Sequence, residues 1–551
     1  MRLRQFILGL IGLVLAAAAS PAHAQITVYA VDGLARVQPH DPPVVAPSIA
    51  ISAARNEYEP FQVIVYAGSG DLKTVRARAT DLRAQDGSTV SSANITLYRE
   101  QYVHVTQMSP RSTEGEGWYP DALVPFVNTS PVIPGERARF RGAPFDVDDN
   151  SNQPVWVDVF VPKATPPGVY NGKITVTASN QTAATITVQL TVWNITLPDT
   201  PSLRSNFGKL GTDIATAHGV VMNSVAFAKP EWEYGEALAA NRISPIIPNM
   251  LYPKVLKDGS IDPSRTDARL KQWIDTFHVT GFPVRLLGDD PAGKDRAKNV
   301  THLRAIYAYL KSHGWEKMAY AYIADEPNTA EAYETLREQA KLIHDVQPGI
   351  KVMAAEQPQP QNPKWGTLVG SVDIWVPLWV LWDDNVIAER ERAGDEVWSY
   401  TAMCQGHKGK DTPYWQIDFP LLDFRIPMWI SWRYGLSGIL YWSSVWWGVT
   451  PDVWTNPGTY KMNHDIYNGD GSLLYPGTAV GVDGPIMSIR LKEIREGFED
   501  YEYLKLLADK GQRPLVDQTV QSIARSWTDW NPDPRALYNA RAAIARALTG
   551  N

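Results

Sequence analysis

The sequence contains one cysteine, Cys404, among its 551 residues. A single cysteine cannot close an intramolecular disulfide and supplies no cluster for zinc or iron-sulfur binding. The ten histidines do not form a metal-binding spacing such as His-Glu-x-x-His. We therefore expect no metal or other cofactor, and we expect stability to come from side-chain packing.

Long basic runs are also missing. Lys and Arg total 52 against 59 Asp and Glu, which gives a formal net charge of -7. This balance argues against a dedicated nucleic-acid binder.

Two further motifs are incomplete. The segment Gly288–Asp295 ends in Asp where a phosphate loop has Ser or Thr, and Gly435–Ile439 lacks the last glycine of a nucleophile elbow. The sequence therefore gives little support to a nucleotide hydrolase or a serine hydrolase.

No apolar run is long enough to span a bilayer. The longest uncharged one, Phe6–Ala18, has 13 residues, follows Arg2 and Arg4, and precedes the small-residue pattern Ala22–Ala24. This order of segments is typical of an export signal, so we predict a signal peptide over residues 1–24. Because no cysteine follows it, no lipid anchor is expected there. The mature protein should be periplasmic or secreted, without a membrane anchor.

The sequence from residue 25 to 201 consists of short runs of alternating polarity separated by turn residues. Examples of the runs are Phe61–Tyr66, Val155–Val161 and Lys173–Ala178. This pattern predicts an antiparallel β-sandwich. Pro198 and Pro201, with the polar residues between them, mark the predicted end of the domain.

Between residues 202 and 488, short apolar runs alternate with helical patterns such as Thr329–His344. About eight runs are present: 206–210, 244–250, 283–288, 318–324, 351–355, 372–378, 396–403 and 438–445. Eight strands joined by helical crossovers favour a (β/α)8 barrel of the TIM type. Residues 489–551 are predicted to form helices that pack on the barrel.

Catalytic residues of such barrels lie where strands end, so polar residues directly after an apolar run carry the most information. Asp325 and Glu326 best satisfy this condition, since they follow the run that ends at Ala324 and precede Pro327. We expect them to face the central cleft. Glu326 has the longer reach and is the better candidate for a general acid. An alternative stays open, because acids at this position could instead cap the following helix.

Tryptophan is concentrated late in the chain. Of the 20 tryptophans, 11 lie between Trp375 and Trp454. Not all of them can be buried without leaving indole N–H groups unpaired, so some should line a cleft. Aromatic faces beside carboxylates suit sugar rings. We predict that Trp379, Trp442 and Tyr400 bind substrate, because they lie close to strand ends, while most of the others pack in the core.

Five segments, in order along the chain, resemble glycoside hydrolase family 123. They are 55–62 (Arg-Asn-Glu-Tyr-Glu-Pro-Phe-Gln), 324–327 (Ala-Asp-Glu-Pro), 438–442 (Gly-Ile-Leu-Tyr-Trp), 468–477 (Asn-Gly-Asp-Gly and Tyr-Pro-Gly at its ends) and 495–504 (Arg-Glu-Gly-Phe-Glu-Asp-Tyr-Glu-Tyr-Leu). The resemblance implies an N-terminal β-sandwich, a catalytic barrel with an Asp-Glu-Pro motif, and a late helix. It also implies a glycan substrate, either an oligosaccharide or a glycoconjugate, and β-N-acetylgalactosaminidase-like activity.

The resemblance further implies substrate-assisted catalysis, in which the 2-acetamido carbonyl of the sugar attacks the anomeric carbon. Asp325 would then orient the acetamido N–H, and Glu326 would protonate the departing oxygen and later activate water. The seventh predicted strand ends in Tyr400-Thr-Ala-Met403 and has no carboxylate there. Many two-carboxylate barrel glycosidases place their nucleophile at this position. Glu356, just after the fifth strand, is the only obvious carboxylate that could replace it and is a further candidate substrate ligand.

Three hypotheses follow. The first is an exported β-N-acetylhexosaminidase that uses substrate assistance. The second is a glycosidase of other specificity, with Glu326 as acid and Glu356 as nucleophile. The third is a glycan-binding protein without catalytic activity. We interpret the late segment 495–504 as a structural helix tied by ion pairs, and Glu57 and Gln62 as sandwich residues that buttress the barrel.

Overall fold

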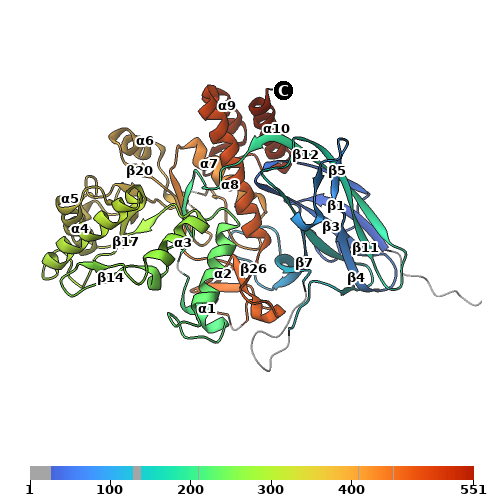
Figure 1. Ribbon diagram of the computed structural model, residues 1–551, viewed down its shortest axis with the longest axis horizontal. Helices are drawn as coiled ribbons and strands as arrows, with labels where there is room; N and C mark the ends of the chain where they lie inside the picture. The colour runs from blue at the N-terminus through green and yellow to red at the C-terminus, as the bar shows by residue number, and fades with distance from the viewer. Residues whose placement is uncertain (1–25, 128–137, 209, 407–408, 451, 551) are drawn as a thin grey trace, which may run out of the picture.

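The computed structural model describes residues 26–127, 138–208, 210–406, 409–450 and 452–550. The predicted signal peptide, residues 1–24, lies outside the described residues. The N-terminal part is a sandwich of two sheets, seen on one side of the molecule in Figure 1. The first sheet has the order β1 (Ile26–Asp32), β3 (Glu57–Ala67), β10 (Ser151–Val161), β7 (Ile95–Val105) and β8 (Gly117–Pro125).

The second sheet packs against the first across an apolar core. Its path is β2 (Ser48–Arg55), β12 (Ala184–Thr196), β11 (Gly168–Thr177), β4 (Leu72–Ala79) and β9 (Phe145–Val147), with β5 (Leu82–Ala84) and β6 (Thr89–Val90) beside it. All pairs are antiparallel except β12 with β2, which run parallel. Alternate residues of each strand fill the space between the sheets.

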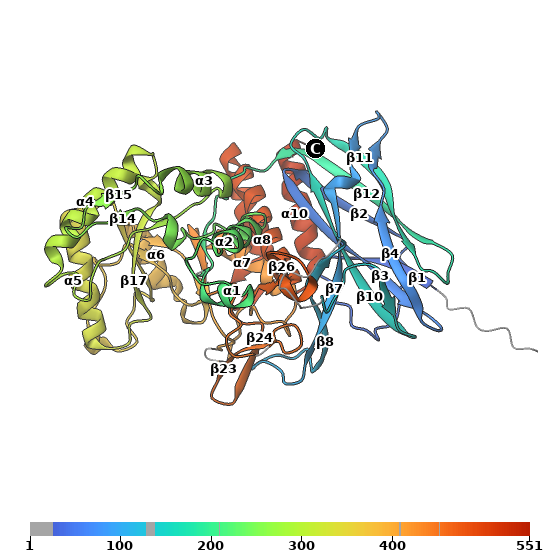
Figure 2. The same ribbon diagram turned by 60° about the horizontal axis from the view of Figure 1, so that its bottom comes forward.

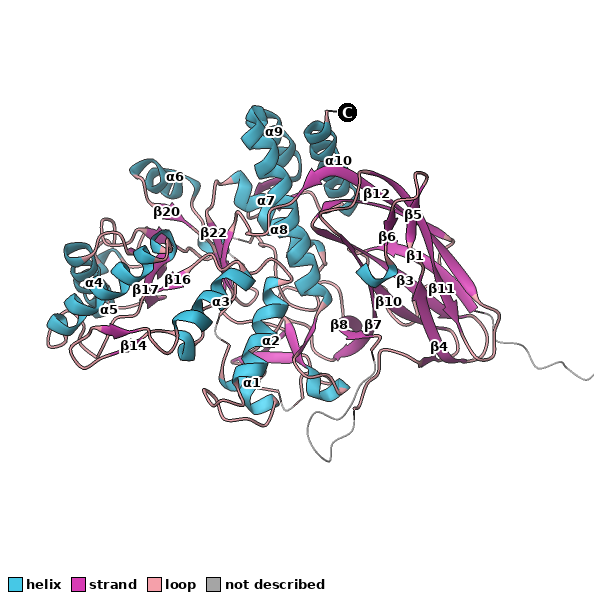
Figure 3. Cartoon of the chain, in the orientation of Figure 1, coloured by secondary structure: helices cyan, strands magenta, loops and turns pink. Residues whose placement is uncertain are grey.

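The middle of the chain forms the parallel strands of a barrel, shown in Figure 3. One ladder has the order β16 (Phe282–Pro283), β17 (Ala319–Asp325), β18 (Lys351–Ala355), β19 (Ile374–Trp375) and β20 (Glu396–Val397). The other has the order β13 (Arg204–Asn206), β22 (Gly438–Tyr441) and β21 (Tyr400–Thr401). A bridge between Leu378 and Tyr400 joins the two ladders. The predicted barrel architecture is confirmed.

The second predicted strand, residues 244–250, is not a strand in the structure. Pro245 and Pro248 have no backbone N–H and cannot donate to a ladder, which explains the difference. Two hydrogen bonds between backbone and side chains partly replace the missing ladder bonds. The Ser244 N–H donates to Ser205 Oγ over 2.9 Å, and the Ser244 hydroxyl accepts from the Thr280 N–H over 3.0 Å.

Alternating residues of the strands fill the barrel interior. A separate buried cluster there consists of Tyr320, Met353, Ala355, Ile374, Val376, Leu378, Trp398, Tyr400 and Leu440. The residues between them face the surrounding helices and belong to the large core cluster. Tyr400 therefore extends from the packed interior toward the mouth of the barrel.

Helices surround the parallel strands. They are α1 (Thr212–Ala217), α2 (Ala228–Ala239), α3 (Asp267–Phe277), α4 (Arg296–Ser312), α5 (Ala330–Val346), α6 (Asp384–Ala393) and α7 (Leu422–Arg433). The helix expected over 329–344 is thus α5. Among the helices of the described ranges, none combines the length and the apolar character needed to cross a membrane.

The C-terminal residues form α8 (Ile489–Leu507), α9 (Arg513–Ile523) and α10 (Pro534–Thr549). In Figures 1 and 2, α8 lies between the sandwich and the barrel. Its contacts agree, since it packs on α7 of the barrel and on β8 and β3 of the sandwich. The prediction of a structural helix in this segment is confirmed. Every residue from Ile489 to Leu504 is buried, including its charged residues.

The charges of α8 are paired with both parts of the protein. Toward the sandwich, Arg490 binds Asp121 of β8 at 2.8 Å, and Arg495 binds Asp158 of β10 at 2.8 Å. Toward the barrel, Asp500 binds Arg425 of α7, also at 2.8 Å.

Two sandwich acids take part from the other side. Glu57 contacts Arg541 of α10 and accepts a hydrogen bond from the Tyr503 hydroxyl, and Glu59 binds Arg541 at 2.8 Å. The buttressing role predicted for Glu57 is therefore confirmed, whereas Gln62 donates to backbone carbonyls within the sandwich.

Breaking one of these buried pairs should cost far more than breaking an exposed one. Burial alone would raise the pKa of Asp158, but the charges of Arg495 and Lys492 outweigh it and hold this pKa below its ordinary value. Asp158→Asn removes the acid that binds Lys492 and Arg495, and of these two buried cations only Arg495 keeps another acid, Glu496, within the described residues, so we expect unfolding to become easier by about 3–5 kcal/mol in urea titrations. Asp345→Asn, which removes exposed pairs with Lys341 on α5 and Arg296 on α4, is the control and should cost about 1 kcal/mol or less. Equal losses for both variants would contradict the interpretation.

Candidate functional site

The two predicted acids lie at the C-terminal end of β17, at the mouth of the barrel. Asp325 is the last residue of this strand and is aligned with Ala355 of β18. The Glu326 N–H donates to the Ala355 carbonyl over 3.0 Å, which continues the ladder by one bond. Both acids are exposed. The structure thus places the pair where barrel enzymes bind substrates.

Glu326 has an unusual backbone conformation. Its φ of 47° lies in the left-handed region, which costs a residue with a side chain about 1–3 kcal/mol. Consecutive side chains of a regular strand point to opposite faces. Because the chain leaves the strand geometry at Glu326, both neighbouring carboxylates reach solvent at the same mouth.

The alternative role as a helix cap is not what the structure shows. The N-cap of α5 is Thr329, whose hydroxyl accepts from the Ala332 N–H over 3.1 Å. Asp325 and Glu326 lie before this cap and make their own contacts with side chains of the barrel. The pair is therefore available for other chemistry.

Each acid has a tyrosine hydroxyl as its partner. Tyr322 donates to Asp325 Oδ1 over 2.7 Å, and Tyr400 of β21 donates to Glu326 Oε1. Burial raises the pKa of both tyrosines above the ordinary value, and the charges of the two acids add to this rise. Both hydroxyls therefore stay protonated near neutrality and act as fixed donors. One oxygen of each carboxylate is occupied, and the other can face a substrate.

Glu356 lies directly after β18 and is 5% exposed. It accepts a hydrogen bond from the Gln357 side chain. Burial raises the pKa of Glu356 to about 7, opposed by Gln357 and the nearby Tyr333 hydroxyl, and supported by the charge of Glu326. Glu356 thus belongs to the same group of acids as Glu326. In a large share of the protein molecules, its carboxyl group carries a proton at neutral pH.

Trp442 follows β22, the neighbour of the strand that carries Tyr400. It is half-buried and packs edge-on against Tyr460 with ring centroids 5.6 Å apart. Its ring covers Gly471, where an added Cβ would lie 2.2 Å from the indole. A glycine is therefore required beneath it.

The adjacent Asp470 is buried and connects the loops that follow two strands. It accepts from Gln416 over 2.8 Å, from the Tyr441 hydroxyl over 3.1 Å and from the Met403 N–H over 3.4 Å. Burial raises its pKa to about 6, while the bonds from Tyr441 and Gln416 oppose the rise. These contacts hold the chain after β21 against the segment that supports Trp442.

Trp379 does not line the cleft. Its side chain is 1% exposed and stacks on Trp527 with ring centroids 4.5 Å apart. The turn that follows β19 directs this ring into the core between the barrel and the C-terminal segment, although the residue lies near a strand end. The predicted substrate contact for Trp379 is therefore wrong, because proximity to a strand end does not set the direction of a side chain.

Sequence reasoning missed Tyr322 and Asp470. A signal for Tyr322 exists, since Tyr320 and Tyr322 alternate within one strand and so share a face. Asp470 occurred only within a segment of the family resemblance, and nothing in its spacing indicated the bonds to Met403 after β21 and to Tyr441 of β22.

The pH dependence of stability tests the protonation of Glu356. An unfolded glutamate titrates near pH 4.3, so between about pH 4 and 7 the folded state retains a proton that the unfolded chain has lost. The contribution of Glu356 to the free energy of unfolding is thus complete at low pH and is lost as the pH rises through the folded pKa. Glu356→Gln cannot lose a proton, so its stability relative to wild type should increase by up to about 3 kcal/mol from pH 4.5 to 8. Urea titrations over this range measure the difference.

The matched control for this measurement is Glu331→Gln, a change of the same kind at an exposed position in the first turn of α5. Its difference from wild type should stay nearly constant with pH. If Glu356→Gln also follows wild type throughout, Glu356 is ionised at neutral pH and the interpretation fails.

Comparisons with known proteins agree with this geometry. A model of the glycoside hydrolase 123 catalytic domain matches residues 291–507, and a model of the glycoside hydrolase 123 N-terminal domain matches residues 37–178. Together they cover more than half of the chain. A search of curated proteins finds no match.

One of the similar solved structures has the same fold over nearly its whole length. A family 123 glycoside hydrolase from Clostridium perfringens, analysed for the details of glycolipid glycan hydrolysis, aligns over 95% of this chain and 97% of its own, with a TM-score of 0.67 and 14% identity. Two others are less similar. They are a family 39 glycoside hydrolase from Bacteroides cellulosilyticus WH2 (82% of each chain, 11% identity, TM-score 0.32) and a β-D-glucuronidase from Dictyoglomus thermophilum (82% of this chain, 68% of the other, 10% identity, TM-score 0.29). With both of its domains matched in order, this chain is a glycoside hydrolase and belongs to family 123.

Proposed function

We propose that the protein is a retaining β-N-acetylhexosaminidase, N-acetylgalactosaminidase-like, that uses the 2-acetamido group of its substrate as the nucleophile. The observation that carries this proposal is the pair of adjacent acids at one strand end, each held by its own tyrosine hydroxyl. A retaining glycosidase with its own nucleophile needs two carboxyl groups about 5–5.5 Å apart on either side of the sugar. Two acids at consecutive positions instead suit a mechanism in which the substrate supplies the nucleophile.

In the proposed first step, the acetamido carbonyl oxygen bonds to the anomeric carbon as the glycosidic C–O bond breaks. Glu326 transfers its proton to the departing oxygen. Asp325 accepts a hydrogen bond from the acetamido N–H and stabilises the positive charge that develops on the resulting oxazolinium ring. In the second step, Glu326 removes a proton from water, whose oxygen attacks the anomeric carbon, and the acetamido group is restored with retained configuration.

The tyrosines prepare both acids for these roles. Tyr322 fixes the orientation of the Asp325 carboxylate, whose second oxygen can accept the N–H. Tyr400 holds one oxygen of Glu326 and leaves the other to exchange a proton with the glycosidic oxygen or with water. Positioned hydrogen bonds of this kind reduce the reorganisation that the transition state requires.

The alternative glycosidase, with Glu356 as nucleophile, is less consistent with the site. A nucleophilic carboxylate must be ionised, and burial raises the pKa of Glu356 to about 7. A protonated Glu356 can instead donate a hydrogen bond to a substrate hydroxyl. The non-catalytic alternative is set aside, because the chain carries the catalytic domain of a hydrolase family.

The choice of leaving group separates the roles of the two acids. Glu326→Gln should lower kcat/KM by about 10²–10⁴-fold for methyl β-N-acetylhexosaminides, and by less for 4-nitrophenyl glycosides, whose leaving group needs little protonation. Asp325→Asn should slow both substrates to a similar extent, because it acts on the acetamido group. Tyr322→Phe should follow the same pattern as Asp325→Asn with a smaller loss. Initial rates on both leaving groups provide the comparison.

Glu331→Gln is the control for these variants and should retain wild-type rates, since this residue is exposed on α5. Paired galactosides and glucosides without the acetamido group should not be cleaved. If they are cleaved, and Glu356→Gln abolishes turnover while Asp325→Asn does not, the alternative mechanism replaces the proposed one.

We also propose that the enzyme acts outside the cytoplasm, in the periplasm or as a secreted protein. The support is the order of a basic start, a short apolar run and the pattern Ala22–Ala24. Expression of the full chain in a bacterial host, followed by N-terminal sequencing of the periplasmic and culture fractions, should give a mature protein that begins at Gln25. An intact N-terminus found only in the cytoplasm would contradict the proposal.

A further inference from the structure

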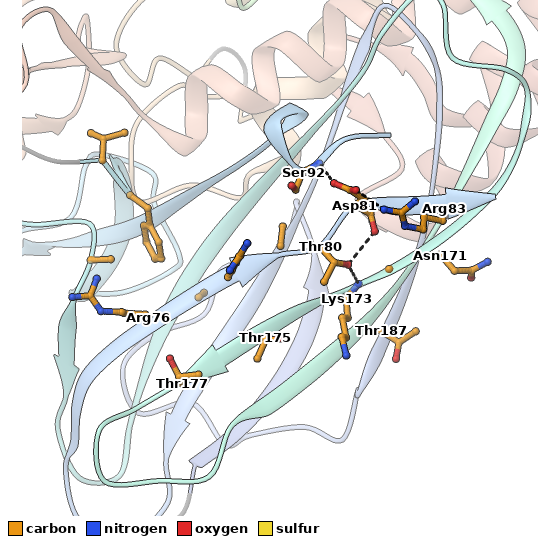
Figure 4. A pocket seen from close by; sticks show the side chains of 17 residues that line it. Arg76, Thr80, Asp81, Arg83, Ser92, Asn171, Lys173, Thr175, Thr177 and Thr187 are labelled. Carbon is orange, nitrogen blue, oxygen red and sulfur yellow. Dashed lines mark hydrogen bonds and ion pairs between the residues drawn. The ribbon is translucent and has the colours of Figure 1, made fainter. Parts of the chain in front are cut away.

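A groove of about 1210 Å³ lies on the outer face of the second sandwich sheet, away from the barrel mouth. Figure 4 shows its labelled side chains on neighbouring strands of this sheet. The floor is formed by β4, β11 and β12, and Phe126 and Val127 contribute apolar surface. A cavity of this size exceeds what one sugar ring requires and can accommodate several residues of a glycan chain.

Strand register brings cations from two strands together in the groove. Arg76 is paired with Thr177 and Arg78 with Thr175 across β4 and β11. Lys173, two residues before Thr175 on β11, points to the same face. All three cations are exposed and line the groove. Lys173 is distant in sequence from the two arginines, so no basic run reveals the group.

These three cations have no partner within the part of the chain that the structure describes. Neither Arg76, Arg78 nor Lys173 forms a side-chain hydrogen bond or ion pair there. Among the described residues that line the groove, the single acid is Asp81, which is already engaged. It binds Arg83 at 2.8 Å and accepts from the Ser92 N–H over 2.9 Å. The groove therefore holds an excess of unpaired positive charge in a chain whose formal net charge is -7.

The remaining lining suits a hydroxyl-rich chain. Thr80, Thr175, Thr177, Thr187 and Asn171 supply hydroxyl and amide groups along the floor. Phe126 offers an apolar surface for the C–H face of a sugar ring. Phe126 is the only aromatic residue in the described lining of the groove, whereas single-stranded nucleic acids need several stacking platforms. A groove in a sheet also admits one extended chain more readily than a flat membrane surface.

We propose that this groove is a second, non-catalytic binding site for an acidic glycan that carries carboxylate or sulfate groups. Arg76 and Arg78 would bind these groups through their planar guanidinium forks, and Lys173 would add a point charge. Binding here goes beyond hydrolysis at the barrel mouth. It would raise the local concentration of acidic chains near the catalytic domain.

Direct binding measurements test the proposal. We would titrate the full chain with hyaluronan oligosaccharides, which carry only carboxylates, and with chondroitin sulfate oligosaccharides, which also carry sulfates. The Glu326→Gln background limits hydrolysis, and neutral chitin oligosaccharides control for the barrel site. Both acidic probes should bind, more weakly at about 150 mM than at about 20 mM salt. The triple variant Arg76→Gln, Arg78→Gln, Lys173→Gln should bind them at least about tenfold more weakly. Preference between the probes identifies the anionic group.

A matched variant controls for net charge. Arg535→Gln, Arg546→Gln, Lys311→Gln removes the same three charges from exposed helix positions outside the groove and should stay within about twofold of the parent. Without the Glu326 change, both triple variants should hydrolyse aryl glycosides like wild type, so this outcome is independent of the proposed specificity.

Three results would overturn the proposal. They are equal weakening by both triple variants, no binding of either acidic probe by the parent, or groove-dependent binding to phosphatidylglycerol vesicles without binding to acidic glycans.

Discussion

The buried ion pairs of α8 are the constraint on which the rest of the structure depends. This one helix forms ion pairs with Asp121 and Asp158 of the sandwich and with Arg425 of the barrel. Isolated, each of these charges would be too costly to bury, so each part of the protein requires the helix and, through it, the other part. Burial also raises the pKa of Glu493 and Glu499 on the same helix, so the network limits its own charge by retaining protons. The sandwich is therefore an integral support for the catalytic barrel.

This rigid base contrasts with the open site that it supports. Asp325 and Glu326 are exposed at the mouth, and so is Tyr322, whereas Tyr400, which holds Glu326, extends from the buried barrel interior. Glu326, which faces solvent, is thus positioned by a tyrosine that the packed interior holds in place. Asp470, in contrast, is itself buried and connects the loops after β21 and β22.

Sequence patterns predicted the parts of the fold that depend on local periodicity. The sandwich, the parallel barrel, α5 and the late helix follow from alternation and helical spacing, and Asp325 and Glu326 follow from the end of a strand. The failures depend on geometry that spacing does not encode. Residues 244–250 form no ladder because two of them are prolines, and hydrogen bonds with side chains take its place. A turn directs Trp379 into the core. The bonds of Asp470 to Gln416 and Tyr441 depend on folding between distant segments, and the gathering of the groove cations depends on the register of β4 and β11.

The left-handed backbone of Glu326 has a consequence for how this enzyme can be altered. A glycine at that position would relieve the backbone strain, and it would also remove the carboxylate. Random mutagenesis selected for thermal tolerance alone would therefore favour loss of the proposed acid, since strain at a functional position is kept only by selection for turnover. Directed evolution of a more robust form needs simultaneous screening for catalysis, and stabilising changes are better sought in the sandwich and the surface helices.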